Sequence, residues 1–317
     1  MEIFLYVCPF LSFLIYQLPK LKIKAEILYG LGIFLFLSSF ILSIFVFFKI
    51  LNLDKDLPSF LYPLLQLDDL FLDWSLRFDL FVSSLIVLNT FIVLILTICV
   101  LNFYRDNILI FKIFSLLSLS VLSFLIFISS NNLIQFFVGW YLIILSSYLI
   151  SNISEKKVKI SENSNIFLYN RVSDLIFFLS LYFIYSNTNS INFDVIFKTF
   201  KLLDHNFSFF NKNINSIEII ALTLFFSFLL RCRQFFIFNS SYDFLKLDVS
   251  FNILLISALY IPAGLYFIFR FLPLTEIHSD FLNVISILGF MLILVFSILL
   301  MQAHNLKKLI IFIGSCQ

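Results

Sequence analysis

Arg171 and Asp174 are the residues of this sequence whose types and spacing best suit proton chemistry. They lie in the segment Asn-Arg-Val-Ser-Asp, near the start of an apolar run over residues 166–186. Residues three positions apart share one face of a helix, so their side chains can pair. Charged groups within a membrane cost roughly 2.5–3.5 kcal/mol on insertion scales and often mark an ion path. The pair therefore predicts a proton relay, and a structural ion pair that anchors the helix end is the alternative.

Arg231 and Arg233 form a second charged site, inside an apolar stretch over residues 219–238. Arginine stays protonated at accessible pH, whereas a buried lysine can lose its proton. Arg231 therefore suits a fixed charge better than a proton carrier. The alternative is that both side chains extend to the membrane interface from a helix that starts late.

Three further ionisable residues are weaker candidates. His304 is of interest because histidine titrates near neutral pH, although a lone loop histidine is often incidental. Lys307 lies at the head of the last apolar run, where lysine side chains also serve as interface anchors. Lys246 stands between two aspartates and fits a solvated loop cluster.

Signatures of metal sites and soluble enzymes do not occur in the sequence. It has no glycine-rich phosphate loop, no HExxH and no paired-histidine haem signature. Its three histidines and four scattered cysteines provide no metal-ligand set and no disulfide framework. We therefore predict no catalytic residue, metal or redox centre in this chain.

The composition shows what surrounds these charged residues. Of the 317 residues 61% are hydrophobic and 13% charged, and the mean hydropathy is +1.05. Soluble domains are about one quarter charged, so lipid must cover much of this surface. The net charge of +2 gives no indication of nucleic-acid binding.

Nine apolar runs are candidate membrane crossings, because a spanning helix needs about 20 mostly apolar residues. They are 3–18, 26–48, 80–103, 108–128, 133–151, 166–186, 218–238, 252–270 and 281–303, and a tenth begins at Leu306. Backbone polar groups in lipid must pair within each segment, so the runs predict helices. We predict an all-α polytopic transmembrane bundle of nine to ten helices and a single domain over 1–317. Longer extramembrane connections cover 49–79 and 187–217, and either can form short interfacial helices.

The distribution of basic residues predicts the orientation. With nine crossings, the loops after the odd-numbered helices hold eleven of the 21 Lys and Arg residues, and the longer opposite loops hold seven. Basic loops face the matrix or cytoplasm. The N-terminus is therefore predicted on the opposite side.

Several motifs occur in one order over about residues 75–317 and together resemble a known family. They are Arg77-x-Asp79, Asn132-Leu-x-x-x-Phe-x-Gly139-Trp140, Arg171-x-x-Asp174, Arg231-x-x-Gln234, Ala263-Gly264-x-Tyr266 with Arg270, and Lys307-Lys308 followed by Ser315-x-Gln317. This pattern resembles antiporter-like subunit 5 of respiratory complex I, the mitochondrial NADH–ubiquinone oxidoreductase.

The resemblance implies an antiporter-like fold with inverted repeats and ionisable groups near the membrane midplane. It implies a multi-pass protein of the mitochondrial inner membrane, with its N-terminus on the intermembrane-space side and other complex I membrane-arm subunits and lipids as partners. It also implies proton translocation coupled to electron transfer from NADH to ubiquinone. NADH, FMN, iron–sulfur clusters and ubiquinone are expected in other subunits. The proton-path candidates are Asp174, Arg171, Arg231 and Lys307, with Tyr141, Arg233, His304 and Lys246 as weaker ones.

The sequence departs from the family at three titrating positions. Tyr141 replaces a glutamate, Arg231 a lysine and Ile256 a histidine. A phenol does not replace a carboxylate in a relay near neutral pH, and a guanidinium does not pass a proton as lysine does. The first proton channel is therefore predicted to be disabled or rebuilt. Two alternatives remain open: a structural remnant of the same arm that does not conduct, and an unrelated multispanning ion carrier.

The position of Gln317 within a family motif suggests a further hypothesis. Family members continue beyond this motif through several more helices. We expect the subunit to be split, with a second polypeptide that continues the fold after Gln317.

Overall fold

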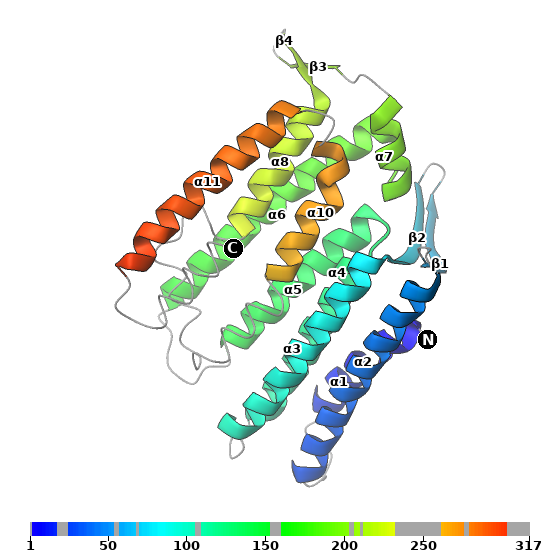
Figure 1. Ribbon diagram of the computed structural model, residues 1–317, viewed down its shortest axis with the longest axis vertical. Helices are drawn as coiled ribbons and strands as arrows, with labels where there is room; N and C mark the ends of the chain where they lie inside the picture. The colour runs from blue at the N-terminus through cyan, green and yellow to red at the C-terminus, as the bar shows by residue number, and fades with distance from the viewer. Residues whose placement is uncertain are drawn as a thin grey trace.

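The computed structural model shows long helices packed side by side along a common direction (Figure 1). It describes residues 2–17, 25–53, 57–67, 70–104, 109–152, 160–202, 206–209, 212–231, 261–275 and 279–302. Ten helices and four short strands lie within these ranges. The predicted all-α transmembrane bundle is confirmed, and the strands lie in the connections.

The helices that follow the predicted runs begin and end within six residues of the expected positions wherever those positions are described. They are α1 (Glu2–Gln17), α2 (Ala25–Leu53), α3 (Leu80–Tyr104), α4 (Leu109–Ile128), α5 (Leu133–Asn152), α6 (Ile160–Thr188), α8 (Ser216–Arg231), α10 (Ile261–Thr275) and α11 (Ser279–Met301). The end of the run 218–238, the start of the run 252–270 and the tenth run from Leu306 lie outside the described residues. α2 and α6 are longer than the apolar runs predicted. α10 also continues beyond the predicted end at residue 270, through Pro273 to Thr275.

Four of the described helices are long and apolar enough to cross a membrane. These spans are Tyr29–Asn52, Leu80–Val100, Phe111–Ile128 and Leu133–Ile150. The serine and threonine hydroxyls within them bond locally: in α3, Ser83 and Thr97 donate hydrogen bonds to the carbonyls of Leu80 and Leu94. Bonds of this kind let a hydroxyl lie in an apolar helix without an unpaired polar group.

The two long connections are only partly as expected. Residues 57–67 and 70–78 form an antiparallel hairpin of β1 (Leu57–Leu67) and β2 (Leu70–Phe78), so the short helix considered for the connection 49–79 is not found in its described part. Of its two prolines, Pro63 lies beside an irregularity in the register and Pro58 is the second residue of β1, and bulges and strand ends are where a strand accepts proline. The second connection does contain a short helix, α7 (Phe193–Leu202), followed by the strands β3 (Asn206–Phe209) and β4 (Lys212–Asn215).

α4 and α5 pack closely because a glycine lies at their contact. A side chain at Gly139 would place its Cβ 2.5 Å from the backbone nitrogen and Cα of Phe127. The backbone cannot move away without separating the two helices, so only glycine fits. Small residues at helix contacts are the usual means of close packing in membranes.

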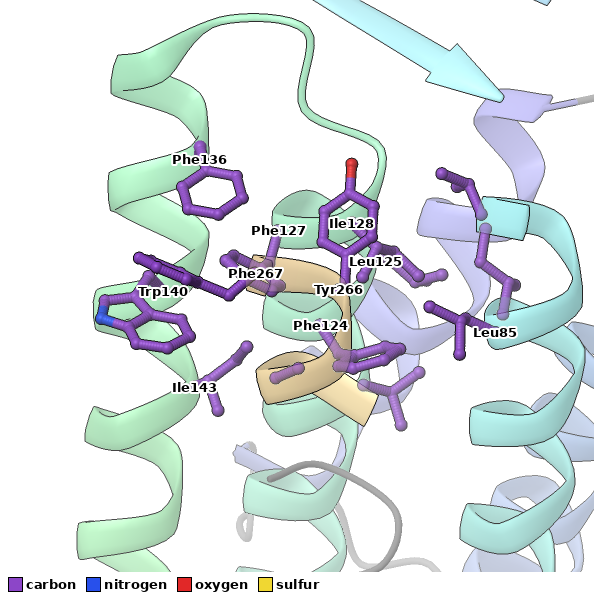
Figure 2. Close-up of a cluster of buried hydrophobic side chains, with 14 of the residues drawn as sticks. Leu85, Phe124, Leu125, Phe127, Ile128, Phe136, Trp140, Ile143, Tyr266 and Phe267 are labelled. Carbon is purple, nitrogen blue, oxygen red and sulfur yellow. The ribbon is translucent and has the colours of Figure 1, made fainter. Parts of the chain in front are cut away.

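An aromatic cluster fills the space between α4, α5, α6 and α10. We define it as Phe127, Phe136, Trp140, Phe177, Tyr266, Phe267 and Phe271, all of which are buried. Figure 2 shows Phe136 and Trp140 of α5 facing Phe127 of α4 and Phe267 of α10. The Phe127 and Phe136 ring centroids lie 4.4 Å apart, and those of Trp140 and Phe267 lie 4.9 Å apart. Centroid separations in this range are typical of aromatic rings in direct contact.

The described connections β1–β2, α7 and β3–β4 lie at one end of the bundle (Figure 1). The short connection from α4 to α5 reaches the same end, where Ser130 forms a bridge with Leu76 and Asn132 forms one with Asn192. We call this end the loop end. It joins segments that are far apart in the sequence.

Candidate functional site

The Arg171–Asp174 pair lies near the middle of α6, where the charged groups are mostly shielded. Arg171 Nη2 and Asp174 Oδ2 are 3.2 Å apart, and the two side chains are 28% and 9% exposed. The spacing of three residues brings both groups to one face of the helix, as the sequence indicates. Pairing offsets part of the cost of placing a carboxylate at this depth.

Tyr141 of α5 contacts this pair through its ring. The Arg171 guanidinium carbon lies 4.5 Å from the centre of the Tyr141 ring. A guanidinium over an aromatic face is attracted by the negative charge density of the ring. At the position where the family pattern has a glutamate, this chain therefore offers Arg171 an aromatic face instead of a carboxylate. Tyr141 acts in this geometry as a positioning residue for Arg171.

We expect the Tyr141 ring, rather than its hydroxyl, to be what stabilises Arg171. Tyr141→Phe should leave the thermal unfolding temperature of the protein close to that of wild type. Tyr141→Leu should lower stability by roughly 0.5–2 kcal/mol, the range of cation–π contacts. Thermal unfolding in detergent checks both variants. If Tyr141→Phe were as damaging as Tyr141→Leu, the hydroxyl would be the important group.

A hydrogen bond holds α6 against α8 beside the pair. The Ser173 hydroxyl donates to the carbonyl oxygen of Ser227 at 2.8 Å, and both residues are fully buried. Arg231 is the last residue of α8, four residues after Ser227. At 1.5 Å per residue, the backbone of Arg231 is about 6 Å further along the helix axis. The C-terminal end of α8 therefore lies beside the part of α6 that carries Arg171 and Asp174.

Several predicted site residues lie outside the described residues. They are Arg233, Lys246, His304 and Lys307, together with Ile256 at the family's histidine position. The described part of the site therefore consists of Arg171, Asp174 and Tyr141, with the helix end at Arg231. Within the described ranges, no group of three or more His, Cys, Asp and Glu residues is placed to hold a metal ion.

A second set of charged residues meets at the loop end. Arg77 Nε lies 2.9 Å from Asp79 Oδ1, and Arg77 Nη1 lies 2.5 Å from Asp194 Oδ1. On the other side, Arg270 Nη1 is 3.9 Å from Asp79 Oδ2, and its Nη2 donates to the carbonyl oxygen of Ser130 at 3.4 Å. The sequence motifs include Arg77, Asp79 and Arg270, but their spacing does not indicate that they meet. Asp194 belongs to none of the sequence motifs.

The bundle of long apolar helices, with an ion pair within it and a group of charged residues at the loop end, defines a class of protein: a polytopic membrane protein. The sequence profile described as NADH:quinone oxidoreductase/Mrp antiporter, transmembrane, matches residues 130–314. Because this match covers more than half of the chain, the protein belongs to that family. Within it the chain is a complex I subunit 5-like protein, since curated relatives of that name match most of its length.

Three relatives illustrate the similarity. The NADH-ubiquinone oxidoreductase chain 5 of Acanthamoeba castellanii is 25% identical over 86% of this chain and 41% of its own length. The protein of the same name from Paramecium tetraurelia is 26% identical over 75% of this chain and 42% of its own length. The chloroplastic NAD(P)H-quinone oxidoreductase subunit 5 of Buxus microphylla is 27% identical over 74% and 32%. The chain thus spans about two fifths or less of the length of these relatives.

A solved structure shows the same fold. A chain of the membrane-bound sulfane sulfur reductase, an archaeal respiratory membrane complex, superposes with a TM-score of 0.78. The superposition covers 100% of this chain and 63% of the other, at 15% sequence identity. This likeness supports the antiporter-like fold alone. Together with the family match, it contradicts the alternative of an unrelated multispanning carrier.

Proposed function

We propose that this protein is a membrane-arm subunit of a proton-translocating NADH:ubiquinone oxidoreductase and contributes to proton translocation. The observation that carries the proposal is the Asp174 carboxylate, buried near the middle of α6 and paired with Arg171. Ionisable groups at such positions usually face a functional path. NADH, FMN, iron–sulfur clusters and ubiquinone belong, in this proposal, to other subunits of the enzyme.

Each candidate residue has a distinct role in the proposal. Asp174 is the group that exchanges a proton, because a carboxyl changes charge when it does so. Arg171 is a fixed charge that controls this exchange through its pairing with Asp174. Arg231 supplies a second fixed charge at the end of α8, and Lys307 is the next titrating group. Four residues have weaker support: Tyr141, Arg233, His304 and Lys246.

The test is proton pumping by the complete complex that carries Asp174→Asn. The amide keeps the shape of the carboxyl group but cannot take up and release a proton in its place. We expect a lower ratio of protons moved per NADH oxidised in sealed vesicles, with the complex still assembled. Glu218→Gln is the matched control, since Glu218 is an exposed carboxylate in the first turn of α8. An unchanged ratio in the Asp174→Asn complex would contradict a role in translocation.

A second candidate function is a structural subunit of the same membrane arm that does not itself conduct protons. The aromatic cluster favours it, because packed rings occupy the space between α4, α5, α6 and α10. A proton path needs a chain of polar groups or water, and the ring faces that meet in this part of the interior are apolar. The same measurement separates the two functions: full assembly with an unchanged proton ratio supports the structural subunit.

The proposed setting is the mitochondrial inner membrane, with the N-terminus on the intermembrane-space side, as the basic residues of the loops indicate. The partners are other membrane-arm subunits and lipids. The exposed apolar residues Ile287, Phe290 and Ile298 of α11 support such neighbours. Mass spectrometry of proteins that co-purify in mild detergent tests this part. Purification of the chain by itself would contradict it.

A further inference from the structure

A group of buried amides at the loop end has polar atoms that no described residue satisfies. Asn131, Asn132 and Asn192 each have a buried Oδ1 without a hydrogen-bond partner among the described residues. Gln135, only 2% exposed, has neither its Oε1 nor its Nε2 paired within those ranges, and the same holds for Nε of Arg270. We call these five residues the amide cluster. Buried polar groups of native proteins are nearly always satisfied, so each of these atoms requires a partner.

Backbone and ring contacts show that the members of the cluster lie together. Asn132 and Asn192 form a β-bridge, and the backbone N–H of Phe193 donates to the carbonyl oxygen of Asn131 at 3.2 Å. The Arg270 guanidinium lies 4.3 Å from the centre of the Phe193 ring. Gln135 is one helical turn from Asn131 and Asn132, in the first turn of α5. The atoms in need of partners thus come from three segments that meet at one place.

The chemistry of these atoms selects the kind of ligand. They comprise four amide oxygens, which accept hydrogen bonds, and two N–H groups, from Gln135 and Arg270, which donate them. A cation would meet the acceptors but would be repelled by the guanidinium. An anion would meet the donors but would face the amide oxygens. The adjacent ion pairs join two arginines, Arg77 and Arg270, to two aspartates, Asp79 and Asp194, so these pairs carry no net charge that selects either ion.

We propose that the amide cluster binds ordered water molecules. Water donates and accepts at once, and a buried water makes about three hydrogen bonds. Six polar atoms therefore correspond to about two water molecules. Arg77 and Asp194, 24% and 56% exposed, lead from the cluster to the surface.

The aromatic cluster closes the water site on the membrane side. Phe136 follows Gln135 in α5, and its ring lies 5.8 Å from that of Phe193 and 5.4 Å from that of Phe271. The hydroxyl of Tyr266 points toward the connection between α4 and α5 (Figure 2). In this proposal the water molecules lie at the loop end, and the rings bound them on the membrane side. This inference does not depend on proton pumping.

A cryo-electron-microscopy map of the intact complex, at a resolution that shows ordered water, tests the proposal. We expect water peaks within hydrogen-bond distance of Gln135 and of at least one of the three asparagines. Gln135→Leu should remove the peak beside residue 135. Asn187→Leu is the control, since the Asn187 amide on α6 is already bonded to the carbonyl oxygen of Phe183, and should leave all the peaks in place.

Two results would overturn the proposal, and both can be read from the wild-type map even if Gln135→Leu fails to fold. One is a map in which the Gln135 amide bonds to protein groups from outside the described ranges. The other is a peak surrounded by five or more oxygens at roughly 2.3–2.6 Å, which would identify a cation.

Discussion

Replacing Arg171 with leucine is expected to destabilise the protein by roughly 3–5 kcal/mol, the usual cost of breaking a buried ion pair. The substitution removes the guanidinium that lies 3.2 Å from Asp174 and leaves a carboxylate that is only 9% exposed. Asp174 must then keep its charge without this partner or take up a proton. The contact between Arg171 and the Tyr141 ring is lost as well. We expect less assembled complex on native gels and a lower unfolding temperature.

A double variant separates the ion pair from simple loss of packing. Arg171→Leu combined with Asp174→Leu removes both charges, and it should be more stable than Arg171→Leu alone. Arg171→Lys keeps the charge but loses the planar group that stacks on Tyr141, so it should fall between wild type and Arg171→Leu. If the double variant were no more stable than the single one, the carboxylate left without Arg171 would not be the source of the loss.

The charged pair of α6 was predictable because its contact is local. Residues three apart on a helix meet whatever the rest of the fold does, so the spacing of Arg171 and Asp174 was enough. The role of Tyr141 was not predictable in the same way. The sequence shows only that a tyrosine replaces the glutamate of the family pattern at this position. The contact with Arg171 depends on how α5 and α6 pack, and no local pattern reports that arrangement.

The loop end was harder to predict for the same reason. Asn131 and Asn132 lie between two apolar runs, and Gln135 follows at the start of the second run. Such a short polar stretch is typical of an ordinary connection between helices. Arg270 and Asp194 belong to other segments. Only the packing of α7 and α10 against the α4–α5 connection brings these groups together.

The hairpin before α3 was missed because its turn signal is weak. Leu67 pairs with Leu70, so two aspartates connect β1 to β2. Two-residue hairpin turns are usually marked by Asn-Gly or Asp-Gly, and this sequence has no glycine there. Prolines in β1 also argued against a strand. The antiparallel pairing overrides these local preferences.

Phe136→Ala is expected to be the most damaging truncation within the aromatic cluster. Phe136 is fully buried, and rings from α4, α6, α7 and α10 surround it, with Phe127 closest at 4.4 Å. Truncation of a buried phenylalanine costs roughly 3–5 kcal/mol in water-soluble cores, partly through the cavity it leaves. In a membrane the packing part of this cost remains, because lipid cannot enter the cavity. We therefore expect a clear decrease in unfolding temperature and in the amount of folded protein.

Phe34→Ala is the matched control, because Phe34 of α2 is 65% exposed and faces outward from the bundle. It removes the same atoms without opening a cavity and should leave stability almost unchanged. The comparison also bears on conduction. If the rings only fill space, Phe136→Ala should lower stability without changing the ratio of protons moved per NADH in the complex that still assembles. A normal unfolding temperature with an altered proton ratio would instead show that the Phe136 ring blocks a path, which would contradict the packing role and favour a conducting subunit.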